Sequence, residues 1–172
     1  MSKLLRYAAV GAVVASFGIA SGAQAATQDS ANVSATILSA LSVAVDPADN
    51  TLDFATIAPG ASAASVVVAP DGSRTCPASL VCSGTTNAPT FNIVGANNAT
   101  VYVRFNNASE TLTDAASDTM TASAFKTSLT ADTATLSGTG TASFTVGGSL
   151  AVGASQPAGN YTGTLTVNVA YN

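Results

Sequence analysis

The chain has 172 residues, no histidine or tryptophan, and five basic residues against nine acidic ones. This balance excludes functions that need clustered lysine and arginine to neutralise phosphate, namely binding to nucleic acid and binding to an anionic membrane by charge. With no histidine, and with Glu110 as the single glutamate, few groups could act as catalytic acids, bases or nucleophiles, so we expect neither enzymatic activity nor a cofactor.

The first 25 residues predict a secretory signal peptide. Lys3 and Arg6 form a basic start, the apolar stretch 7–20 follows, and residues 21–25 (SGAQA) end in the small-residue pattern of a cleavage site. The apolar stretch is shorter than the roughly 20 residues that a membrane-spanning helix needs. We expect cleavage after Ala25 and export of the mature chain without membrane insertion. That chain keeps three basic and nine acidic residues, a net charge of −6.

The segment 31–47 has a two-residue apolar period, which is typical of a β-strand. Two interpretations are open: one continuous strand, or a break at Ser39 and Ala40 that separates an N-terminal strand from the first domain strand at 40–45. We take residues 26–38 as an N-terminal extension and residues 39–172 as the domain. The apolar residues that share one parity are Val33, Ala35, Ile37, Leu41, Val43 and Val45.

The rest of the chain predicts an all-β domain. Turn signals such as APG, PDGS and SGTG separate short stretches rich in β-prone residues, and no helical apolar stripe is present. Many short strands in about 150 residues favour an antiparallel two-layer sandwich, or a small barrel. Strands are expected at 34–37, 41–45, 51–57, 63–68, 90–94, 101–105, 120–125, 142–146, 149–152 and from 161 onward.

Cys76 and Cys82, with five residues between them in an exported protein, predict a disulfide that closes a small loop. A metal site at this pair is disfavoured, because the chain has no histidine and no second cysteine pair. Asp46, Asp49 and Asp53 form a loose group of oxygen ligands that could hold a surface calcium ion, although their spacing matches no EF-hand loop.

The chain ends in a strongly patterned strand. Its apolar face consists of Tyr161, Gly163, Leu165, Val167, Val169 and Tyr171, and the residues between them are threonine, asparagine or alanine. An unpaired edge strand exposes a row of backbone donors and acceptors, so we expect this strand to have a partner on at least one side.

Four stretches together resemble a known family. "LDFATIAPG" (52–60), "VVVAPDGSRTC" (66–76), "FNIVG" (91–95) and residues 144–172 are similar to the bacterial secreted family described as domain of unknown function 4402, which is regarded as pilin-like. The resemblance is loose over 96–140. At Ala55 this chain departs from the glycine that usually follows Leu-Asp-Phe.

More distantly, the β-patterned extension and the penultimate Tyr171 resemble subunits of chaperone-usher fimbriae. These have an Ig-like sandwich that is short of one strand. The resemblance implies donor-strand complementation, in which a periplasmic chaperone fills the groove first and residues near 28–38 of the next copy fill it afterwards. It also implies an outer-membrane usher as a partner. Donor residues Val33, Ala35 and Ile37 would then fill a groove whose acceptor edge is formed by Tyr161, Leu165, Val167, Val169 and Tyr171.

We therefore expect a structural subunit of an extracellular fimbria that serves surface attachment or biofilm formation. The alternative is a monomeric secreted adhesin or a carbohydrate-binding β-sandwich module, and the few aromatic residues of the chain count against it. A self-complemented monomer, whose own N-terminal strand fills the groove, keeps the fold without the polymer.

Overall fold

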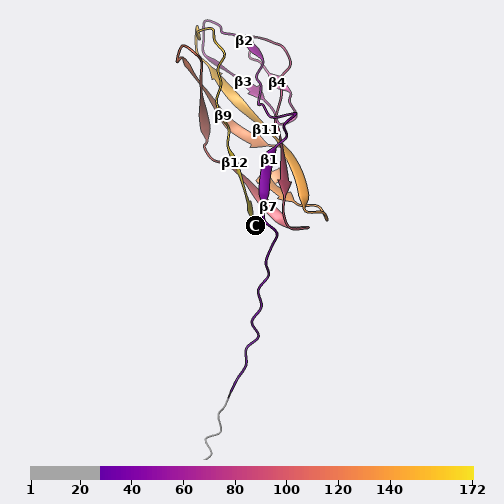
Figure 1. Cartoon of the computed structure of the whole chain (residues 1–172). Coiled ribbons are helices and arrows are strands. Elements are labelled where there is room, and N and C mark those ends of the chain that lie inside the picture. Colours follow the sequence, from indigo (N-terminus) through magenta and orange to yellow (C-terminus); the bar gives the residue numbers. More distant parts are fainter. Residues whose placement is uncertain (1–27) are drawn as a thin grey trace, which may run out of the picture. The chain divides into compact units, whose positions relative to one another are not determined.

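The structure is a computed structural model that describes residues 28–172 (Figure 1). The predicted signal peptide and its cleavage site lie outside these residues. The chain divides into two units after Ala35, and the second unit, residues 36–172, is the folded domain. Within the described residues, the search for a helix that is long and apolar enough to cross a membrane finds none.

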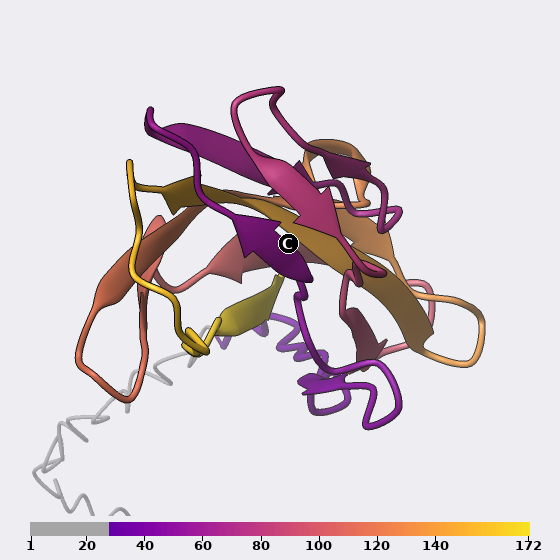
Figure 2. The ribbon, with the colours of Figure 1, turned by 90° about the horizontal axis from the view of Figure 1, so that it is seen from above.

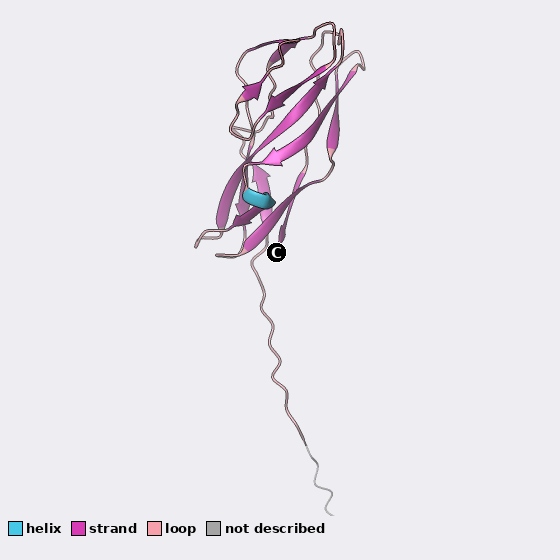
Figure 3. Ribbon diagram, turned by 180° about the vertical axis from the view of Figure 1, so that it is seen from behind, coloured by secondary structure: helices cyan, strands magenta, loops and turns pink. Residues whose placement is uncertain are grey.

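The domain is all-β, as predicted, and the strands pair antiparallel (Figure 3). The one helical element described is a single 3-10 turn, η1 (Thr130–Asp132). The strands are β1 (Ser42–Val45), β2 (Thr56–Ala58), β3 (Ala64–Val68), β4 (Arg74–Thr75), β5 (Val81–Ser83), β6 (Thr90–Val94), β7 (Thr100–Phe105), β8 (Ser109–Thr113), β9 (Thr119–Thr127), β10 (Thr133–Thr135), β11 (Thr141–Val152) and β12 (Val167–Tyr171).

Strand β11 organises the larger sheet and passes across the domain in the view from above (Figure 2). Its first half pairs with β6, and its second half pairs with β3 and β9. The sheet has the order β1-β6-β11-β3-β4, and β8 is added to it through β9. A smaller sheet has the order β10-β7-β12, and β2 and β5 form a separate two-stranded ribbon.

Two clusters of buried apolar side chains form the core. One cluster lies between β6 and β11 on one side and β7, β10 and β12 on the other, and contains the fully buried Ile93, Val101 and Val146. The other cluster packs Phe54 and Leu80 against the buried faces of β3, β9 and β11. The sheets thus face one another across buried side chains in a sandwich-like arrangement.

The predicted strands 142–146 and 149–152 are one strand in the structure. Gly147 and Gly148, which separate the two predicted strands, form an irregularity within β11, where the pairing with β9 shifts register. A β-carbon at Gly147 would overlap the backbone of Val68 and Pro70, so this glycine permits a close approach of β3 rather than a reversal of the chain.

One other strand prediction is wrong, and two are wrong in part. Residues 34–37 form no strand. In 51–57, Asp53 makes an isolated bridge to Asn87 and the ladder begins only at Thr56, because Ala55 has a φ of 59°. In the closing segment the ladder begins at Val167 rather than at Tyr161.

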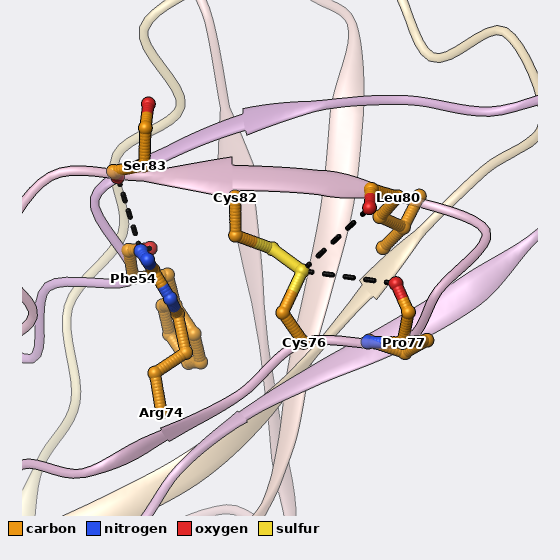
Figure 4. Close-up of a disulfide and its surroundings, with 7 residues drawn as sticks. All are labelled: Phe54, Arg74, Cys76, Pro77, Leu80, Cys82 and Ser83. Carbon is orange, nitrogen blue, oxygen red and sulfur yellow. Dashed lines mark hydrogen bonds between the residues drawn. A yellow bond between two sulfur atoms is a disulfide. The ribbon is translucent and has the colours of Figure 1, made fainter.

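The predicted disulfide between Cys76 and Cys82 is present (Figure 4). Beside it, Arg74 Nη1 donates to the carbonyl oxygens of Ser83 at 3.0 Å and of Phe54 at 3.4 Å. The closed loop is short, so the disulfide is expected to contribute only about 2 kcal/mol to stability. The disulfide therefore fixes a loop beside the β2–β5 ribbon and leaves the main sheets to the hydrophobic core.

Candidate functional site: the groove between β1 and β12

Strand β12 lies at the edge of its sheet. It pairs with β7, from Val167 opposite Phe105 to Tyr171 opposite Val101, and with no other described strand. At the two ends of this ladder, Asn106 N donates to Thr166 O, and Asn172 N donates to Thr100 O. Because an antiparallel ladder alternates, Val167, Val169 and Tyr171 direct their backbone N–H and C=O groups away from β7.

Strand β1 borders the same opening from the other sheet. It pairs with β6, and Asp46 N donates to Thr90 O just beyond the ladder. By the same alternation, Val43 and Val45 turn their backbone groups away from β6. Strands β1 and β12 approach one another, yet within the described chain no ladder joins them. The sandwich is therefore open along the seam between its first and last strands.

An apolar cavity continues this seam. Its volume is about 450 Å³, and its walls include Val45, Leu52 and Phe91 on one side and Leu112, Phe125 and residues 161–165 on the other. A second cavity of about 560 Å³ shares Leu52, Leu112 and Tyr161 with the first. We call the whole opening the edge groove; it is bordered by β1 and residues 51–52 on one side and by residues 161–171 on the other.

Burial alternates along the predicted acceptor edge. Tyr161, Leu165, Val169 and Tyr171 are half-buried and Val167 is buried, whereas the residues between them are exposed. Residues 161–166 form no regular ladder, but Thr162 exchanges two backbone hydrogen bonds with Thr113, at 2.9 and 3.1 Å. Tyr161 and Leu165 line the cavity, whereas Val167 belongs to the buried cluster between the sheets and Val169 and Tyr171 pack against it.

A family model described as domain of unknown function (DUF4402) matches residues 41–171. The chain belongs to the DUF4402 family. No curated protein and no solved structure matches it. The DUF4402 match begins one residue before β1 and ends on the last residue of β12. The two strands that border the edge groove are therefore the two ends of the DUF4402 domain.

The predicted donor residues precede the DUF4402 domain. Val33 is 96% exposed and Ile37 is 94% exposed, Ala35 is exposed as well, and none of the three belongs to a strand. Of the two interpretations of segment 31–47, the structure supports the break, although β1 begins at Ser42 rather than at Ala40. We call residues 28–38 the N-terminal arm.

Tyr171 anchors the chain at the point where the arm joins the DUF4402 domain. Its hydroxyl donates to Ser39 O at 2.8 Å and accepts from Ala96 N at 2.6 Å. A β-carbon at Gly95 would lie 2.6 Å from the same hydroxyl oxygen, so glycine is needed for the tyrosine to reach this position. The sequence predicted Tyr171 as part of the acceptor edge, but no sequence signal indicated that its hydroxyl joins both ends of the domain.

Replacing Tyr171 with phenylalanine should lower the free energy of unfolding by about 2 kcal/mol, because two hydrogen bonds are lost and Ala96 N is left without its acceptor. Urea denaturation of the mature chain measures this change. Tyr102→Phe is the matched control, since Tyr102 is 37% exposed and its hydroxyl has no hydrogen bond within the described residues. Equal stability losses in the two variants would contradict the anchoring role.

The three aspartates considered as possible calcium ligands, Asp46, Asp49 and Asp53, make hydrogen bonds within the domain. Asp46 accepts from Ala48 N, and Asp53 accepts from Ala55 N. Hydrogen bonds from the Thr90 hydroxyl and the Asn87 side-chain amide lower the pKa of the Asp49 carboxyl. Among residues 28–172, no group of three or more acidic or cysteine side chains is arranged to hold a metal ion. The three aspartates thus stabilise the backbone between β1 and β2.

Proposed function

We propose that this chain is a structural subunit of an extracellular fimbria, in which the N-terminal arm of one copy fills the edge groove of the next. The observation that carries the proposal is the edge groove itself, with unpaired backbone groups on both borders and an apolar cavity between them. An extended peptide placed there can pair with both borders and complete the sandwich. The fimbria then serves surface attachment or biofilm formation.

The arm fits the groove in length and in pattern. The predicted extension 26–38 has thirteen residues, enough to span the eleven residues of the groove border 161–171. Val33 and Ile37 lie on one side of an extended arm, and burying each of them contributes roughly 1.5–3 kcal/mol. Both are almost fully exposed in the single chain, which supports a role outside that chain's own core.

The direction of insertion decides between a filament and a closed pair. Because the Tyr171 hydroxyl binds Ser39, the C-terminal end of the arm joins the domain at the end of the groove where β12 ends. A donor that runs antiparallel to β12 would continue into its own domain beyond the Tyr161 end of the acceptor. Each added copy repeats this head-to-tail contact, which does not close and produces a filament. A donor that runs parallel to β12 would allow two copies to exchange arms and close.

Side-chain size and charge favour the antiparallel direction. In the register that places Ile37 opposite Gly163, Ala35 faces Leu165, Val33 faces Val167 and Ala31 faces Val169. Three of these four pairs join a large side chain to a small one. The parallel direction would bring Asp29 toward Glu110, a carboxylate in the cavity wall, and the two acids would repel one another.

The same proposal covers export and assembly partners. The predicted signal peptide delivers the chain to the periplasm, where an unfilled groove would expose apolar surface and a free strand edge. A periplasmic chaperone would cover the groove, and an outer-membrane usher would mediate its exchange for the arm of the next copy. The mature fimbria lies on the cell surface.

A disulfide between Thr36→Cys and Thr164→Cys tests the proposed contact. In the antiparallel register these exposed residues face one another as a pair without ladder hydrogen bonds, with Cα atoms about 4.5 Å apart, which suits a disulfide. Mixing two singly substituted chains under oxidising conditions should give a linked pair. The doubly substituted mature chain should give a ladder of oligomers on a non-reducing gel.

The control carries the second cysteine at Asn172 instead of at Thr164. Asn172 lies eight residues further along the border, about 26 Å away in an extended chain. If Thr36→Cys cross-links to Asn172→Cys and not to Thr164→Cys, the donor runs parallel to β12 and the proposed antiparallel direction is wrong. If the singly substituted chains fail to link while the doubly substituted chain closes on itself, the chain is a self-complemented monomer and the filament proposal is wrong.

A further inference from the structure

One carboxylate, that of Glu110, lines the apolar cavity of about 450 Å³ in the edge groove. We propose that protonation of Glu110 controls how tightly the groove holds the donor strand, so that acidic conditions strengthen the contact between copies. This inference rests on the proposed function and adds a regulatory residue to the same site.

Glu110 belongs to the inner wall of the groove. It lies on β8 opposite Ala122, between the exposed residues Ser109 and Thr111, and it is half-buried like Leu112 on the same side of the strand. Its side chain lines the 450 Å³ cavity together with Phe125 and Leu165. Its Oε1 accepts a hydrogen bond of 2.9 Å from Asn107 Nδ2, which is its one side-chain partner among the described residues.

Filling the groove changes the surroundings of this carboxylate. In the empty groove water can reach the cavity and solvate the negative charge. In the proposed register, Ala35 faces Leu165 and Ile37 faces Gly163, both of which line the cavity beside Glu110. These apolar side chains would displace the water, and the charged form of a carboxyl group is disfavoured when it loses its solvation. The filled groove therefore favours the neutral, protonated form.

No cation in the described neighbourhood offsets this loss of solvation. Lys126 on β9 and Arg104 on β7 are exposed, and neither lines the cavity. Tyr161 is the other titratable residue in the lining; its hydroxyl donates to Pro157 O and accepts from Gln156 Nε2.

The direction of the pH dependence follows from proton linkage. If donor binding is accompanied by proton uptake at Glu110, the affinity for the donor rises as the pH falls. Glu110→Gln, which is neutral at all pH values, should bind the donor at neutral pH as tightly as the acid form of the wild type does.

The test measures binding of a fluorescent peptide with the sequence of residues 26–38 and the substitution Asp29→Asn, capped at both ends so that the peptide does not titrate. The acceptor is the full mature chain with Ile37→Asp, which blocks its own arm. We expect at least about tenfold tighter binding at pH 4.5 than at pH 7.5. Addition of Glu110→Gln should abolish this difference and strengthen binding at pH 7.5.

Asp118→Asn is the matched control, because Asp118 follows β8 in the turn to β9 and does not line the cavity. This variant should keep the pH dependence of the parent, and circular dichroism at both pH values checks that all variants are folded. If Glu110→Gln keeps the full pH dependence while the peptide binds, the role of Glu110 is wrong and the proposed function stands. If the peptide binds to no variant at either pH, both proposals fail.

Discussion

Replacement of Ile37 with aspartate is expected to leave the mature chain monomeric. In the proposed filament Ile37 enters the cavity beside Gly163, and a charged side chain there would lose its solvation without a partner. The lost apolar burial alone weakens the contact by roughly 1.5–3 kcal/mol, and the buried charge adds several kcal/mol more. Together these exceed a factor of about 100 in affinity. Size-exclusion chromatography with light scattering, and negative-stain microscopy, measure the outcome.

Thr36→Asp is the control for this prediction. Thr36 is the exposed neighbour of Ile37 and would face outward beside Thr164, so an added charge there should leave the polymer intact. Mixing gives a further test: Val45→Asp blocks the cavity but keeps the arm, whereas Ile37→Asp blocks the arm but keeps the cavity. The two variants should combine into discrete pairs that do not grow. If the Ile37→Asp chain forms the same polymers as the wild type, the assignment of the donor strand is wrong.

Replacement of Phe144 with alanine should lower the free energy of unfolding by about 3–5 kcal/mol, the range for large-to-small changes at a buried aromatic residue. Phe144 is the fourth residue of β11, is 2% exposed, and stacks on Phe91 with ring centroids 5.4 Å apart. Phe91 also lines the groove cavity, so the same change would alter the groove. Urea denaturation of the mature chain measures the loss of stability.

The neighbouring Ser143→Ala serves as the comparison, because Ser143 is exposed on the same strand. A surface change of this kind should stay within about 0.5 kcal/mol. If Phe144→Ala proved as mild as Ser143→Ala, β11 would not be the centre of the core, and the description of the two clusters would be wrong.

The apolar alternation of the sequence predicted the strands that have one buried face. Strand β6 has the predicted bounds 90–94, and β7 and β3 differ from their predictions by one residue. The strands that were missed are rich in threonine or very short. Strand β8 (SETLT) presents only Glu110 and Leu112 inward, and β10 (TAT) only Ala134, so the alternation of small polar residues gave no apolar signal.

The site was predictable on one side only. The parity of Leu165, Val167 and Val169 identified the apolar face of the closing segment, because side chains of an extended chain alternate. The other border depends on β1, which is more than one hundred residues away in sequence, and no local pattern specifies such a pairing. The cavity and the position of Glu110 follow from how the strands meet in space, and for the same reason the sequence did not indicate them.

The Tyr171 hydroxyl has a mechanical consequence. A pull on the arm reaches the domain at Ser39, and the next ordered element is β1, a four-residue strand that could be peeled from β6 one hydrogen bond after another. The bond from Tyr171 to Ser39 passes part of that load to β12 in the opposite sheet, while the bond from Ala96 ties in the turn between β6 and β7. Rupture then has to shear both layers at once, which a fibre subunit under tension requires more than a free monomer does.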